Sequence, residues 1–183
     1  MDVRAMESFT SLLAIIAASG AIVLVIARSI SSAWAPAADF VRSVNAVSSW
    51  LAWLVAAAAT AGSLYFSEVA DYVPCRLCWF QRICMYPLAG ILLVGALRRD
   101  RSVKWYALPL LVAGAMLSAY HYLIEWRPSL DGGACGVGPS CTDVWFRSHG
   151  FVTLAFMALA GFAAIAALLF VTPVGDGRER SED

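Results

Sequence analysis

Charged residues are scarce in this sequence. Asp, Glu, Lys and Arg together make up 14% of its 183 residues, whereas apolar residues make up 61%. Ordinary soluble domains carry charge on about a quarter of their residues, so a soluble protein is excluded. The sequence also shows no phosphate-binding loop, hydrolase triad or nucleic-acid-binding surface, and we expect no nucleic-acid partner. Any chemistry must therefore be performed by apolar segments and the short connections between them.

Long apolar runs take up most of the chain. A helix that crosses a bilayer needs about 20 mostly apolar residues. Five runs reach that length, at about 9–30, 46–66, 78–97, 103–123 and 151–171. We therefore predict an all-α integral membrane protein with five spanning helices. The polar segment 173–183 is expected to be a disordered tail.

The orientation follows from the basic residues. Four of them crowd into the short link "LRRDRSVKW", namely Arg98, Arg99, Arg101 and Lys104. Cytoplasmic connections collect Lys and Arg, so this link is predicted to be cytoplasmic. The connections before and after it then lie on the outer side of the cell membrane, together with the N-terminus.

An alternative concerns the first apolar run. The segment "SSAWAPAADF" places Ala33 and Ala35 in the small-x-small pattern of a signal-peptidase site. Cleavage there would reverse the later crossings and put the basic link outside, against the charge bias. We therefore favour a retained additional helix.

Four of the five cysteines form two close pairs, Cys75 with Cys78 and Cys135 with Cys141. Both pairs fall on the predicted outer side, where disulfides persist. Bridges that close such short loops restrict the unfolded chain only slightly. A redox role is therefore favoured over stabilisation, although simple structural bridges remain the alternative.

The first pair stands where an apolar helix begins, directly after Pro74. A helix N-terminus favours a thiolate. Arg82 follows Cys78 at i+4, so the two side chains should share one face and one pocket. The alternative is that Arg82 extends to the lipid headgroups. Cys84 points elsewhere and is expected to be a small apolar core residue.

The second pair brackets "GVGPS" in a hydrophilic stretch. Glycine and proline let the chain turn tightly enough to join Cys135 to Cys141. We expect this loop to be unshielded and accessible, which suits a dithiol that must meet another protein. Glu125, just before it, is expected to solvate the loop.

The stretch "PCRLCWFQRICMYPLAG" and the second pair in the next outer loop together resemble the DsbB family of disulfide bond formation proteins. The likeness is strongest to a subgroup with "CxxCWFQR". It implies a four-helix bundle at 45–172, preceded here by an additional helix and link at 1–44. It further implies oxidation of an extracytoplasmic, DsbA-like thioredoxin-fold protein, with electrons passed to a membrane quinone, ubiquinone or menaquinone.

The resemblance also implies roles for individual residues. Cys75 and Cys78 match the quinone-side pair, with Cys78 engaging the quinone ring. Arg82 matches the quinone-site arginine. Cys135 is expected to form the mixed disulfide with the partner, and Cys141 to pass electrons to Cys75. The loop pair is separated here by only five residues, "GVGPS", which is shorter than in many members.

Two polar residues are added as candidates for binding the quinone. His121 lies near the outer end of the fourth run, where it could reach a quinone carbonyl; the alternative is an interfacial histidine within an aromatic belt. Gln81, at i+3 from Cys78, could hydrogen-bond the ring or simply join helices. Trp145 and Phe146 are expected to wall the pocket or to anchor the protein at the headgroups.

Three other functions share part of this pattern. Proteins like vitamin K epoxide reductase also combine a quinone with two cysteine pairs, but there the loop pair comes first. Four outer cysteines could instead form a structural zinc site, although the oxidising compartment leads us to expect no metal. A transporter or scaffold locked by disulfides is the third alternative.

Overall fold

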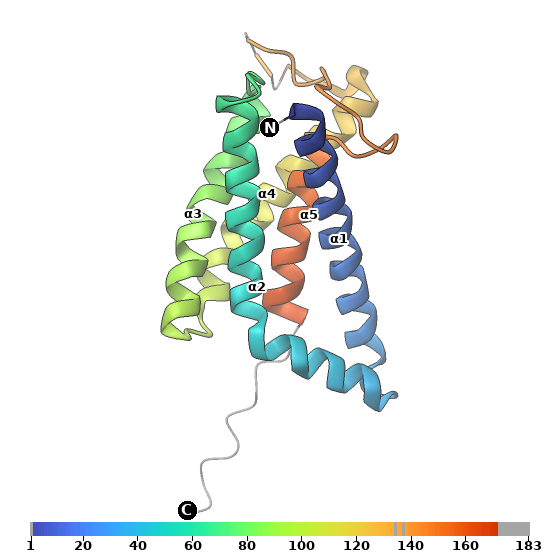
Figure 1. The fold of residues 1–183 in the computed structure, drawn as a ribbon, viewed down its shortest axis with the longest axis vertical. Helices are drawn as coiled ribbons and strands as arrows, with labels where there is room; N and C mark the ends of the chain where they lie inside the picture. The colour runs from blue at the N-terminus through green and yellow to red at the C-terminus, as the bar shows by residue number, and fades with distance from the viewer. Residues whose placement is uncertain (1, 134, 137, 172–183) are drawn as a thin grey trace, which may run out of the picture.

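A computed structural model describes residues 2–133, 135–136 and 138–171. Within them are five long apolar helices, each a candidate membrane span (Figure 1). They are α1 (Val3–Ile30), α2 (Ala35–Glu68), α3 (Arg76–Arg98), α4 (Val103–Trp126) and α5 (Leu154–Ala166), which η2 (Ala167–Val171) continues, and a short helix η1 (Pro128–Leu130) follows α4. The predicted all-α membrane class is confirmed. The tail predicted at 173–183 lies outside the described residues.

The second helix begins earlier than its apolar run. Trp34 is its N-cap, and Pro36 stands in the first turn, where a missing N–H costs no hydrogen bond. Figure 1 shows the first part of α2 lying across the lower end of the molecule before the helix turns up into the bundle. The sequence predicted only the part from residue 46, because an apolar run indicates where a helix enters the membrane. The more polar residues before it can also be helical, so the helix extends beyond the apolar run.

The short basic link joins α3 to α4 as predicted. Arg99 ends α3 in the left-handed conformation, with φ of 51°. The backbone N–H of Asp100 then bonds the Gly95 carbonyl at 2.9 Å, and the Asp100 carboxylate accepts from the N–H of Ser102 at 2.8 Å. The two helices are therefore antiparallel neighbours, and the two cysteine segments emerge at the opposite end.

Small residues let the helices pack closely. Ala52 and Ala56 of α2 are fully buried, as is Leu88 of α3. The ring of Phe162 on α5 lies directly over Gly114 of α4, so a Cβ built at Gly114 would come within 2.2 Å of it. Small residues at helix crossings are typical of membrane proteins, where close backbone approach replaces the hydrophobic effect.

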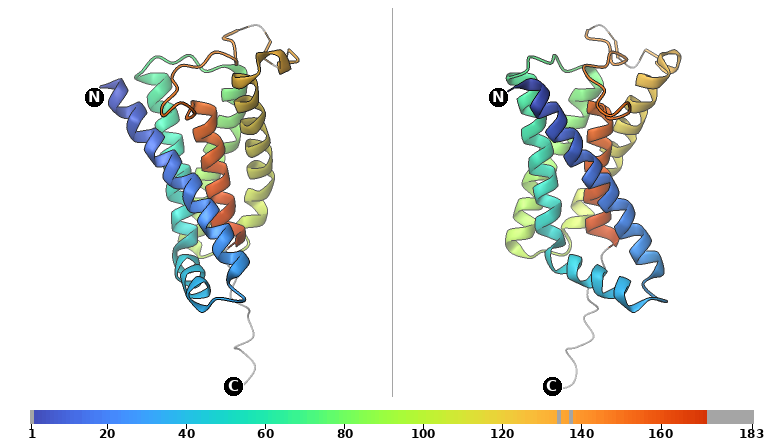
Figure 2. Two further views of the ribbon diagram at one scale, coloured as in Figure 1. Left: turned by 90° about the vertical axis from the view of Figure 1, so that its right-hand side faces the viewer. Right: turned by 45° about the vertical axis from the view of Figure 1, so that its right-hand side comes forward.

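The first helix packs obliquely against α5 and α2 (Figure 2). Its N-terminal end lies with the cysteine segments, because the hydroxyl of Tyr72, in the α2–α3 connection, donates a hydrogen bond to the Glu7 carboxylate. The N-terminus and both cysteine pairs therefore occupy the same end of the bundle.

Candidate active site

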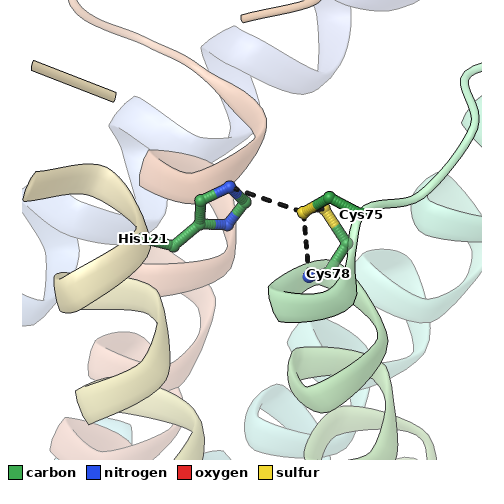
Figure 3. Close-up of side chains that lie close together, drawn as sticks. All are labelled: Cys75, Cys78 and His121. Atoms are coloured by element: carbon green, nitrogen blue, oxygen red, sulfur yellow. Dashed lines mark hydrogen bonds between the residues drawn. The ribbon is translucent and has the colours of Figure 1, made fainter. Parts of the chain in front are cut away.

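The first cysteine pair lies at the start of α3, where Cys75 is the N-cap residue. The backbone N–H of Cys78 donates a hydrogen bond to the Cys75 sulfur at 3.3 Å. The two sulfur atoms lie 3.0 Å apart, and both residues are free thiols (Figure 3). The Cys75 sulfur thus occupies the place that a serine or aspartate oxygen takes at other helix starts. The positive end of the helix dipole acts on it there.

Cys75 is strongly acidic for a thiol. Hydrogen bonding to Cys78 is the largest cause and outweighs burial, which by itself would raise the pKa; a further contribution comes from His121. Together these effects lower the pKa of Cys75 to about 4. Cys75 is therefore a thiolate at neutral pH, the form that takes part in disulfide exchange.

His121 of α4 lies between the two cysteine pairs. Its Nε2 is 3.8 Å from the Cys75 sulfur (Figure 3) and 3.1 Å from the carbonyl oxygen of Cys141. Its Nδ1 is 3.3 Å from the side-chain nitrogen of Gln81. Because a carbonyl can only accept, Nε2 carries the proton, and Nδ1 accepts from the Gln81 amide. His121 is thus buried between the two cysteine pairs, and its contact with a quinone carbonyl stays a prediction.

The loop cysteines are joined and buried. Cys135 and Cys141 form a disulfide, and their exposed fractions are only 7% and 0%. They pack with Cys75, Leu77 and Ile124 in one apolar cluster. The expectation of an unshielded dithiol is therefore wrong for the two cysteines, whereas the described residues between them, Gly136 and 138–140, are exposed as expected. The reason is that the ends of α3 and α4 supply apolar cover from segments distant in the sequence.

A cavity of about 410 Å³ lies beside Cys78, among α1, α2, α3 and α5. Cys78, Gln81 and Arg82 contribute to its lining from α3. Most of its remaining lining is apolar and includes Leu54 of α2 and Met157 of α5. Cys75 and His121 are not among the residues that line it. The two cysteines of the first pair therefore face different surroundings, with Cys75 toward the loop disulfide and Cys78 toward the cavity.

Arg82 is held at the edge of this cavity. Its Nε donates to the Ser63 hydroxyl at 3.0 Å, and its Nη2 donates to the Ser63 carbonyl at 3.0 Å. Its guanidinium also lies over the ring of Trp79, 5.3 Å from the centroid. Arg82 therefore faces α2 and the cavity, which favours the shared pocket over an extension to the headgroups. This fits the rule that cations at membrane depth face protein.

Aromatic side chains line the cavity where it approaches the cysteine loops. Tyr72 stacks on Trp145 with ring centroids 4.7 Å apart and on Phe66 at 5.6 Å. All three residues line the cavity, and Phe146 packs against Phe66. Trp145 is therefore part of the wall while half of its surface remains exposed.

Glu125 was expected to solvate the loop, and that expectation is wrong. Only 8% of its surface is exposed. Its Oε2 accepts a hydrogen bond from the Thr153 hydroxyl at 2.6 Å, and its Oε1 lies 3.9 Å from His121 Nε2. The i+4 spacing of His121 and Glu125 on one helix was the available signal.

The disulfide argues against the alternative of a structural zinc site made by four thiolates. Cys135 and Cys141 are bonded to each other, so four outer thiolates are not available together. Among the residues that the structure describes, potential metal-ligating atoms of Cys75, Cys78 and His121 lie within 4.8 Å of one another. Cys84 is free and buried in the main core, as expected for a small apolar residue.

The chain is similar in sequence to known proteins over most of its length. A family model for "Disulfide bond formation protein DsbB" matches residues 45–172. Disulfide bond formation protein C of Bacillus subtilis (strain 168) is 43% identical over 117 residues, which cover 63% of this chain and 85% of the relative. No solved structure matches the chain.

Two further relatives carry similar names. A probable disulfide formation protein C of Halalkalibacterium halodurans is 48% identical over 115 residues, covering 62% of this chain and 83% of the relative. A probable disulfide formation protein of Coxiella burnetii is 42% identical over 120 residues, covering 64% and 82%. With its paired cysteines at one end of a helical membrane bundle, the chain belongs to the DsbB family of disulfide bond formation proteins.

Proposed function

We propose that this multi-pass membrane protein is a quinone-dependent thiol oxidase that reoxidises a DsbA-like dithiol protein outside the cytoplasm. The position of Cys78 carries the proposal. Its sulfur lies 3.0 Å from that of Cys75, which packs against the loop disulfide, and its side chain also lines the cavity. One dithiol thus connects a disulfide at the end of the bundle with a cavity between the helices.

Two thiol–disulfide exchanges carry electrons inward. The partner's dithiol reduces the Cys135–Cys141 bond through a mixed disulfide on Cys135, and the partner leaves as a disulfide. The Cys135–Cys141 dithiol then reduces a Cys75–Cys78 disulfide by way of Cys141 and Cys75. Each exchange breaks one S–S bond and forms another, so two electrons reach the inner pair. The loop disulfide and free inner thiols described above correspond to the state after the second exchange.

The lowered pKa of Cys75 supports electron transfer from the loop cysteines to the inner pair. A low thiol pKa stabilises the reduced form of a dithiol and makes its disulfide more oxidising. Hydrogen bonding to Cys78 lowers the pKa of Cys75, and this stabilisation of the reduced inner pair supports electron flow toward it. His121 supports this by facing the Cys75 sulfur while its Nδ1 is held by Gln81.

The cavity fits a quinone by the chemistry of its lining. Arg82 and Gln81 offer hydrogen-bond donors for ring oxygens beside Cys78, and the apolar remainder suits an isoprenoid tail. A bound ubiquinone or menaquinone would supply an acceptor for two electrons and two protons. Such an acceptor must reside in the bilayer, which explains why the dithiol adjoins apolar helices.

The orientation proposed for this reaction follows the basic link. Arg99 and its neighbours join α3 to α4 at the end opposite to the cysteines. If that link is cytoplasmic, both cysteine pairs meet proteins outside, in a compartment where disulfides persist.

Anaerobic mixing tests the proposal directly. Purified protein, a short-chain quinone and a reduced thioredoxin-like dithiol protein are combined, and quinone absorbance is followed. We expect one quinone reduced per partner disulfide formed, because each transfer moves two electrons. No quinone reduction with any such partner would reject the proposed function.

Cys141→Ser is expected to trap the partner. In this variant Cys135 is a free thiol that attacks the disulfide of the oxidised partner and releases one partner thiol. Because Cys141 is missing, the mixed disulfide on Cys135 should persist as a higher-mass band on non-reducing gels. Cys84→Ser is the matched control and should trap nothing, because Cys84 is buried in the core away from both pairs. A trapped partner in Cys135→Ser, but not in Cys141→Ser, would reverse the two roles.

A further inference from the structure

The first helix lies outside the family match at 45–172, yet it forms one side of the cavity. Five of its residues line that space: Thr10, Leu13, Ala14, Ile16 and Ala17. With a rise of about 1.5 Å per residue, they extend for about 10 Å along the helix axis. Without α1, the cavity-lining residues of α2 and α5 on this side would face lipid.

The same helix is tied to both cysteine segments. The Tyr72 hydroxyl donates to the Glu7 carboxylate, and burial and this hydrogen bond raise the pKa of Tyr72 to about 12. Tyr72 therefore remains a donor at physiological pH. Its ring stacks on Trp145, four residues after Cys141. Glu7, Tyr72 and Trp145 thus connect α1, the α2–α3 connection and the loop after the second cysteine pair.

These contacts lie where the cavity approaches the surface. Tyr72 and Trp145 both line it, and Glu7 is less than one turn before Thr10, the first α1 residue in the lining. The lining then becomes more apolar along α1. The end near Cys78 and Arg82 suits a polar ring, and the part bounded by Leu13 and Ala17 suits only a hydrocarbon chain.

We infer that α1 is a wall of the quinone site, in which Leu13 and Ala17 contact the isoprenoid tail and the Glu7–Tyr72 hydrogen bond closes the end near the cysteines. The inference rests on the proposed function for the identity of the occupant. A tailed quinone is favoured over a lipid acyl chain because Cys78, Gln81 and Arg82 offer groups for a ring that an acyl chain lacks. The additional helix would then set how tightly the tail is held.

Ala17→Phe tests the wall. Its ring should occupy the space of the tail, so binding of a tailed quinone should weaken on the order of tenfold, as for overpacked sites. Binding of a tail-less ring analogue should weaken far less. Equilibrium binding is measured by quenching of tryptophan fluorescence, and circular dichroism checks helix content. Ser19→Phe is the control because Ser19 lies on the exposed face of α1, and it should bind both quinones as the wild type does.

The outcomes separate the inference from the function on which it rests. If the wild type binds both quinones and Ala17→Phe binds them equally well, the inference about α1 is overturned but the proposed function is not. Equal weakening for tailed and tail-less quinones would also overturn it, because the ring site would then be disturbed instead. Failure of the wild type to bind either quinone would reject the proposed function first.

The closing hydrogen bond has its own test, a double-mutant cycle of Glu7→Leu, which removes the acceptor, and Tyr72→Phe, which removes the donor. Each change should speed release of the tailed quinone by roughly three- to tenfold, the range for one lost hydrogen bond. The double variant should release it no faster than the more affected single variant, because both remove the same contact. Multiplied effects would show that the two residues act separately and would overturn this part of the inference.

Discussion

Arg82→Met is expected to lower quinone-dependent turnover by roughly 10- to 100-fold, the range of a charge-assisted hydrogen bond of about 1.5 to 3 kcal/mol. Methionine keeps an unbranched, mostly apolar chain at the edge of the cavity but cannot donate to a ring oxygen. Turnover is followed by quinone absorbance. Exchange between the loop disulfide and a reduced partner, measured in a single turnover without quinone, should be much less affected, because that step occurs at Cys135.

Two further variants separate the charge of Arg82 from its structural contacts. Lysine should restore activity only in part, because it supplies the charge without the planar set of donors. Ser63→Ala removes one of the two groups that hold the guanidinium and should have a smaller effect. Equal loss in the quinone-dependent and quinone-free assays would indicate misfolding, and wild-type rates in both would remove Arg82 from the quinone site.

Gly114→Ala is expected to destabilise the bundle. The new Cβ would lie 2.2 to 2.7 Å from three atoms of the Phe162 ring, and that ring is only 1% exposed. Overpacking of this kind costs roughly 1 to 3 kcal/mol. Unfolding in mixed micelles, followed by circular dichroism, measures the loss.

Gly90→Ala is the matched control, because a Cβ there meets nothing within 4 Å. Both changes gain the same helix propensity of about 1 kcal/mol over glycine, so the difference between the two variants isolates the overlap with Phe162. If Gly114→Ala and Gly90→Ala are equally stable, the Phe162 ring can move away from the new methyl group without cost. Phe162 also lines the cavity, so a displaced ring should weaken quinone binding as well.

The sequence predicted most of what local spacing can determine. Five apolar runs predicted five helices, since bilayer thickness sets the length of a span. The i, i+4 spacing predicted that Cys78 and Arg82 would adjoin one cavity. The position of Cys75 at a helix start followed from Pro74 and the run after it.

Contacts between distant segments were not predictable in the same way. The loop disulfide is buried because the ends of α3 and α4 happen to cover it, and the hydrophilic sequence around Cys135 gave no sign of that cover. Glu125 looked like a loop residue because its partner, Thr153, is supplied by the start of α5. Likewise, α1 lines the cavity because it packs against α5. No motif in the sequence indicates that packing.

The enclosure of Cys141 bears on which reductants can supply the enzyme with electrons. On the proposed function, an open loop disulfide would also react with small thiols and pass their electrons to the quinone without oxidising any protein. Here Cys141 has no exposed surface and its carbonyl is fixed by His121. Cys135, the sulfur proposed to react with the partner, is itself only 7% exposed. We therefore expect attack to require displacement of the loop, which a protein with a complementary surface would promote better than a small thiol. On the proposed function, burial of the disulfide would favour reaction with a protein dithiol over reaction with small thiols.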